Sequence, residues 1–137
     1  MAMKTLRPNQ WEELLTTAAR TTAITGTTIE FTLTEGCRGF FLFLDVTGVT
    51  DTPGLTPSVN IVDPGGDNDA EPIATFGAFA PSGASHKVYL VYAGAVETGA
   101  LTPLEMQGVP APPHGTITVA VADTDSCTYG IRAYGLG

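Results

Sequence analysis

Basic residues are scarce in this chain. Six lysines and arginines stand against 14 aspartates and glutamates among 137 residues, which gives a formal net charge of −8 at pH 7. A nucleic-acid backbone and an anionic membrane surface both carry negative charge and would repel such a chain. We therefore expect neither a nucleic acid nor a membrane among its partners.

Long apolar runs are also absent. The longest nearly uninterrupted one, residues 38–49, is shorter than the roughly 20 residues that a membrane-spanning helix needs. No apolar segment follows the basic residues Lys4 and Arg7, so we expect no secretory signal. The two cysteines, Cys37 and Cys127, are too few for a disulfide framework. Because nothing indicates export, we expect both thiols to be free.

The 38–49 run is the stretch around which the rest of the chain is organised. It contains three phenylalanines, two leucines and two valines, with glycines near both ends. In an extended strand, side chains alternate between two faces. One face would carry Phe40, Leu42, Leu44 and Val46, and the other Phe41 and Phe43. Apolar residues on both faces predict a central strand, packed on one side by its own core and on the other by a neighbouring segment or subunit.

Other segments have the strand period of two, and turns rich in Gly and Pro separate them. The predicted strands cover about residues 27–34, 38–49, 55–62, 73–79, 87–92, 115–122 and 127–136. The sequence therefore predicts an all-β fold, an antiparallel β-sandwich or jelly roll of about seven to eight strands. Turn residues at 79–85 and 122–126 predict β-hairpins.

The first 26 residues differ from the rest, so we divide the chain into an N-terminal arm (1–26) and a β-sandwich domain (27–137). Asn9 and Glu12 have the spacing of a helix capping box, and apolar residues follow at helical spacing, which predicts a short helix over 10–18. The threonines of this segment favour an extended edge instead. Under the arm model, deletion of residues 1–20 leaves the fold intact.

No group of residues makes a convincing catalytic or metal site. Asp63, Asp67 and Asp69 lack the spacing of an EF-hand loop, and solvation of a turn explains them better. His86 and His114 are too far apart in sequence to form a metal motif, and there is no Gly-x-Ser-x-Gly nucleophile elbow. We expect no enzymatic activity, no cofactor and no metal.

Several motifs resemble a family of small structural proteins of tailed bacteriophages. The resemblance rests on residues 14–21, on 38–49 leading to Thr52-Pro53, on the strand and Asp-Pro turn at 59–64, and on the ending 123–131. It covers most of the chain from Leu14 onward, and it implies an extended conformation for the segment 14–20. The stretch 94–113 departs from the family because it is longer and richer in proline.

The resemblance implies a capsid decoration (cement) protein that binds and stabilises the shell of major capsid protein. It would lie on the capsid surface of a virion assembled in the host cytoplasm, as a homo-oligomer that analogy suggests is a trimer. A tryptophan with aliphatic neighbours has the composition of an interface hot spot. The residues expected to contact the shell and sister subunits are Trp11, Leu14, Leu15, Leu101, Leu104 and Met106.

An alternative keeps the virion but changes the site: a minor tail or fibre-associated module that binds carbohydrate. A row of exposed aromatic side chains at Tyr89, Tyr92 and Tyr134 would support this alternative, and burial of all three would count against it.

Overall fold

The computed structural model describes residues 3–21, 27–50, 54–62, 70–97, 104–121 and 126–137. Within them the chain forms ten strands and no helix, so it has no helix that could cross a membrane. The strands are β1 (Lys4–Leu6), β2 (Trp11–Thr21), β3 (Thr27–Leu33), β4 (Gly39–Val49), β5 (Leu55–Val62), β6 (Ala70–Thr75), β7 (Ser85–Tyr92), β8 (Leu104–Gln107), β9 (His114–Val121) and β10 (Ser126–Leu136).

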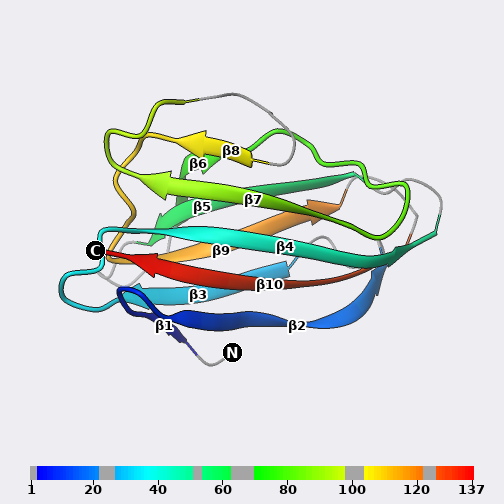
Figure 1. The fold of residues 1–137 in the computed structure, drawn as a ribbon, viewed down its shortest axis with the longest axis horizontal. Coiled ribbons are helices and arrows are strands. Elements are labelled where there is room, and N and C mark those ends of the chain that lie inside the picture. The colour runs from blue at the N-terminus through cyan, green and yellow to red at the C-terminus, as the bar shows by residue number, and fades with distance from the viewer. Residues whose placement is uncertain (1–2, 22–26, 51–53, 63–69, 98–103, 122–125) are drawn as a thin grey trace.

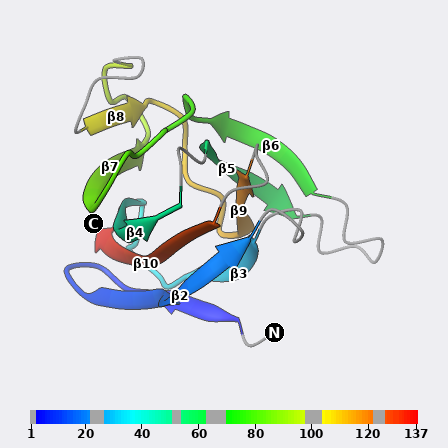
Figure 2. The same ribbon diagram turned by 90° about the vertical axis from the view of Figure 1, so that its right-hand side faces the viewer.

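The strands form two five-stranded sheets that pack as a sandwich (Figures 1 and 2). The order is β1-β3-β9-β5-β6 in the first sheet and β2-β10-β4-β7-β8 in the second sheet. The all-β sandwich expected from the sequence is confirmed. The 38–49 run becomes β4, the middle strand of the second sheet, as its two apolar faces predict.

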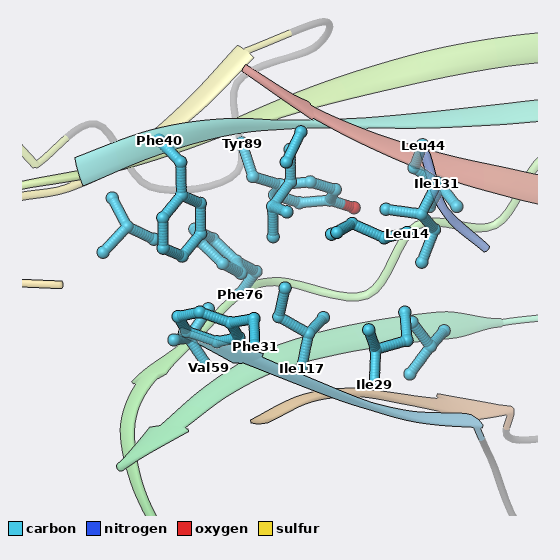
Figure 3. Close-up of a cluster of buried hydrophobic side chains, with 14 of the residues drawn as sticks. Leu14, Ile29, Phe31, Phe40, Leu44, Val59, Phe76, Tyr89, Ile117 and Ile131 are labelled. Atoms are coloured by element: carbon cyan, nitrogen blue, oxygen red, sulfur yellow. The ribbon is translucent and has the colours of Figure 1, made fainter. Parts of the chain in front are cut away.

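The core lies between the sheets (Figure 3). The inward row of β4, from Phe40 to Val46, packs against residues of the first sheet such as Phe31 and Ile117, and all are almost completely buried. The Phe31 and Phe40 rings meet edge to face, with centroids 5.3 Å apart. Each such side chain contributes about 1.5–3 kcal/mol by leaving water. Both cysteines are buried in this core, and their thiols are free, as predicted.

The predicted helix over residues 10–18 is wrong, because residues 11–18 belong to strand β2. Its threonines are β-branched and favour an extended backbone, and β10 offers an antiparallel partner from Trp11 to Thr21. Asn9 caps no helix. It adopts a left-handed φ of 60° in the turn before β2, a conformation that Asn tolerates better than most residues, and its N–H donates to the Gly135 carbonyl at 2.8 Å.

The segment predicted as a separate arm supplies one strand to each sheet. β1 pairs in parallel with β3 in the first sheet, and β2 pairs with β10 in the second. Leu6 and Leu14 are only 1% and 4% exposed, within the common core. Deletion of residues 1–20 would therefore remove core side chains together with β1 and most of β2, the edge strands of the two sheets, so we expect it to disrupt the fold.

The two predicted hairpins are also wrong. β6 and β7, which flank residues 79–85, belong to different sheets, and so do β9 and β10, which flank 122–126. The turn residues 122–125 themselves lie outside the described part of the chain. Turn chemistry predicts that a chain reverses, but it does not determine whether the next strand pairs beside the last or crosses to the opposite sheet.

A buried ion pair joins β7 to the edge strand β8 of the second sheet. The Lys87 ammonium on β7 lies 3.3 Å from a Glu105 carboxylate oxygen on β8, and the two side chains are 2% and 3% exposed. The same carboxylate accepts hydrogen bonds from the Gly77 N–H at 3.0 and 3.2 Å. The pair therefore joins the short edge strand β8 both to β7 and to the segment that follows β6.

We expect Lys87→Met to destabilise the fold by about 3–5 kcal/mol, because it strands a buried carboxylate. The double variant Lys87→Met/Glu105→Gln removes that charge and keeps an oxygen for the Gly77 N–H, so it should recover a large part of the loss. Urea unfolding followed by circular dichroism measures both variants. Equal stability of the single and double variants would contradict a stranded charge as the cause.

The Tyr89 hydroxyl is buried and has no hydrogen-bond partner among the described residues. Burial, with a smaller contribution from the Glu105 carboxylate, raises the pKa of Tyr89 well above its ordinary value of 10.0. The unfolded chain loses this proton near pH 10, and the folded chain retains it. The group therefore has no effect on the unfolding free energy below that pH, and it lowers stability as the pH rises further.

Tyr89→Phe should therefore flatten the alkaline decrease in unfolding free energy. At neutral pH the variant should be at least as stable as the natural chain, because burial of an unpartnered hydroxyl costs about 1–3 kcal/mol. Urea unfolding at a series of pH values between 7 and 11 tests both expectations. A clear loss of stability at neutral pH would show that the hydroxyl is satisfied within the fold.

Candidate functional site

The outer face of the second sheet carries two adjacent rows of side chains that cross all five strands. In the order β2, β10, β4, β7 and β8, the first row is Trp11, Tyr134, Phe41, Leu90 and Met106. The second row is Glu13, Arg132, Phe43, Val88 and Leu104. Alternation along each strand places these side chains opposite the buried ones. We call this surface the apolar face, since eight of its ten residues are apolar or aromatic.

Part of the apolar face is hollowed. Trp11, Phe41, Phe43, Val88 and Tyr134 line an open depression of about 550 Å³, which we call the aromatic hollow. The Trp11 and Tyr134 rings lie 5.2 Å apart at 57° to one another. Trp11 is 58% exposed, and the other four side chains are half-buried. Aromatic rings that remain partly in water beside a hollow are typical of a surface that binds something.

This face also carries a positively charged side chain, Arg132 on β10. The Arg132 guanidinium lies 5.7 Å from the Trp11 ring centroid and 5.5 Å from that of Phe43. The Phe43 ring also stacks on His86, with centroids 5.2 Å apart and planes at 14°. These contacts fix the Phe43 ring between two polar groups. The face therefore combines apolar rings with a positive charge, on a chain whose net charge is strongly negative.

The structure places three of the six residues predicted to contact partners on the apolar face. Trp11 lies on β2 at one edge of the apolar face, and Leu104 and Met106 lie on β8 at the other. Leu14 is 4% exposed and belongs to the core, and Leu15 is half-buried against that core. The remaining residue of the six, Leu101, lies outside the described residues.

The residues that join these two edges were not among the six. Tyr134, Phe41, Phe43, Val88 and Leu90 fill the strands between β2 and β8. Phe41 and Phe43 had a signal in the sequence, because they alternate with the core residues of their strand. Tyr134, Val88 and Leu90 also alternate with core residues of their strands. The sequence alone does not show that they lie beside Phe41 and Phe43, because that depends on the order of the strands in the sheet.

The three tyrosines of the carbohydrate alternative do not form one exposed row. Tyr89 is 1% exposed and points into the core, as Figure 3 shows. Tyr92 and Tyr134 are half-buried, and the Tyr92 hydroxyl donates to the Gly137 carbonyl at 3.0 Å. Since two of the three remain accessible, the condition that would count against this alternative, burial of all three, is not met.

The other chemical candidates take ordinary roles or lie outside the described residues. The acidic loop Asp63, Asp67 and Asp69 falls in the undescribed segment 63–69. His114 Nε2 lies 2.8 Å from a Glu30 carboxylate oxygen, and this pair is partly exposed. Among the residues that the structure describes, no group of three or more His, Cys, Asp or Glu side chains is placed to hold a metal ion.

Trp11 should contribute little to stability despite its size. Trp11→Ala loses the ring contact with Tyr134, which is worth about 0.5–1.5 kcal/mol. In contrast, Phe40→Ala opens a cavity in the core and should cost about 3–5 kcal/mol. Urea unfolding of the two variants measures the difference. Equal losses would mean that Trp11 is a structural residue and not one held available for a partner.

Comparisons with protein-family models, curated proteins and solved structures found no match to this chain.

Proposed function

We propose that this chain is a structural protein of a tailed-bacteriophage virion that decorates the capsid and stabilises the shell of major capsid protein. The single observation that carries the proposal is the apolar face, which crosses all five strands of one sheet. Monomeric soluble proteins rarely expose a large continuous apolar patch without a partner for it. The partner we propose, the major capsid protein, comes from the resemblance of the sequence motifs to the phage structural family.

The chemistry of the face suits docking onto a protein surface. Trp11 is the most exposed of its aromatic residues, and tryptophan, tyrosine and arginine are the residue types most often found as anchors of interfaces. Continuous strand pairing and a packed core hold the underlying sheet rigid. Binding therefore costs little conformational entropy, because the surface is already ordered. Because a capsid shell repeats the same binding site many times, an oligomer that makes several modest contacts at once would bind with high avidity.

The proposal places the protein on the capsid surface of a virion assembled in the host cytoplasm, in contact with the major capsid protein and with sister subunits. The trimer suggested by analogy belongs to the same proposal. No catalytic step, cofactor or metal enters it, and neither a nucleic acid nor a membrane is a partner.

A second candidate function has one observation in its favour. The aromatic hollow, with Arg132 and Glu13 beside it, resembles surfaces on which a sugar ring stacks while its hydroxyl groups bind charged side chains. A tail or fibre module that binds carbohydrate would use the same face. Retention on a glycan array by the natural chain, and its loss in Trp11→Ala, would favour this candidate.

Electron cryo-microscopy of the intact virus particle tests the virion role directly. We expect density for this chain at symmetry-related positions over the capsid lattice, with the apolar face toward a neighbouring protein. Density confined to the tail would replace the decoration role with the second candidate. Absence from the particle would overturn both.

A matched pair of variants tests the docking surface. Leu104→Lys places a charge on the β8 side of the apolar face, and we expect it to lower occupancy on purified shells at least tenfold. Ala120→Lys makes the same change in charge at an exposed position of β9 in the first sheet, and should bind like the natural chain. Quantitative gel analysis of pelleted shells measures both. Equal binding would exclude this face as the docking surface.

A further inference from the structure

The segment Val109–Pro113, which joins β8 to β9, has a backbone restricted by three prolines. Proline fixes φ near −65°, and the residue before a proline is driven into the extended region. Val109, Ala111 and Pro112 each precede a proline, and Pro110, Pro112 and Pro113 are prolines themselves. Every residue of the segment is therefore biased toward the polyproline II helix, which has three residues per turn.

Exposure along this segment follows the same period of three. Pro110 and Pro113 are exposed, and Pro112 between them is buried. Val109 and Ala111 pack against the core. Residues three apart lie on one side of a polyproline II backbone, and the extended stretch between the bends at Val109 and Pro113 has its two exposed prolines at this spacing. We take Pro110 and Pro113 as the accessible edge of the segment, which also lines an open hollow with Ile61 and Ile73.

Hydrogen bonds hold this edge in place. The Leu33 N–H donates to the Pro113 carbonyl at 2.9 Å, and the Thr32 hydroxyl donates to the same oxygen at 3.1 Å. The edge is thus preorganised by its own sandwich, which lowers the entropy cost of docking it elsewhere.

The aromatic hollow is the complementary surface. Proline-rich segments in the polyproline II conformation dock into grooves lined by aromatic rings, and exposed Trp and Tyr side chains are the usual components of such grooves. The same chain carries both halves of this interaction. We propose that the Pro110–Pro113 edge of one copy docks into the aromatic hollow of a second copy, in a head-to-tail contact.

The two halves belong to different parts of the sandwich, so the contact requires a second copy. The segment crosses from the second sheet to the first at the left-hand end of the sandwich in Figure 1, whereas the hollow lies on the outer face of the second sheet. Charge does not oppose this pairing of surfaces. Val109–Pro113 carries no charged residue, so it approaches Glu13 and Arg132 beside the hollow without adding to the repulsion between two chains of net charge −8.

A head-to-tail contact uses a different surface on each partner, so it either closes into a ring or continues as an open assembly. The proposal deepens the virion role by naming the contact between sister subunits, and it rests on that role only for its biological setting. It leaves the β8 half of the apolar face, around Leu104, for the shell.

Mixing two variants provides the decisive test. Trp11→Ala removes the hollow's most exposed ring, and the double variant Pro110→Ala/Pro113→Ala removes the docking edge at two exposed positions. In sedimentation velocity, the natural chain should associate with rising concentration, and each variant alone should remain a monomer. An equimolar mixture keeps one intact contact and should form a 1:1 dimer that grows no further.

Each other result overturns the proposal. A natural chain that stays monomeric at its highest soluble concentration excludes the contact, and so does a proline variant that associates like the natural chain. A mixture that remains monomeric while the natural chain associates shows that the interface is not head-to-tail. Far-ultraviolet circular dichroism of each variant confirms that the fold is retained.

Fluorescence gives an independent measurement, because Trp11 is the only tryptophan in the chain. A synthetic peptide spanning residues 107–115, added to the monomeric proline variant, should shift Trp11 emission to shorter wavelength and saturate. The same peptide with alanine in place of Pro110 and Pro113 should cause no shift. Equal responses to the two peptides would exclude recognition of the proline edge.

Failure of this proposal and failure of the virion role can be told apart. A monomeric chain that still occupies the capsid lattice overturns the head-to-tail contact alone. A chain that associates through the proline edge but is absent from particles overturns the virion role alone.

Discussion

The two-sided apolar character of β4 is the constraint on which the rest of the structure depends. As the middle strand of the second sheet, β4 must have a strand on each side, and β10 and β7 fill these places. Its inward row builds the core against the first sheet. Its outward residues Phe41 and Phe43 cannot reach that core, so they require apolar neighbours on the outer face or a partner. The apolar face is thus the outer counterpart of the same sequence pattern.

Much of the fold could be predicted from sequence because buried strands leave a period of two. The strands that were found, such as β4 and β9, alternate clearly, and the inward residues predicted for β4 are buried. A helix was preferred to an extended edge for β2 because Trp11, Leu14, Leu15 and the alanines after them coincide with helical spacing. β10 decides the question, since its pairing supplies the hydrogen bonds that an isolated segment of this length would have to make locally.

The candidate site was predictable only in part, for a different physical reason. Trp11, Leu104 and Met106 stood out as apolar residues in segments without a clear core role. The sequence does not show that they share one face, because two edge strands over 80 residues apart meet on it only through the order of β10, β4 and β7 between them. Leu14 was misassigned for the same reason, since the direction of a side chain depends on the phase of its strand in the sheet.

The buried ion pair connects the interior to this surface. β8 has only four residues, so its apolar content alone would fix its register weakly. A slip of one residue would turn Glu105 toward water and bring Leu104 and Met106 inward. Such a slip would leave the Lys87 ammonium unpaired in the core, which is strongly unfavourable. The pair therefore selects the register in which Leu104 and Met106 face outward, and in this way a buried charge determines the composition of the apolar face.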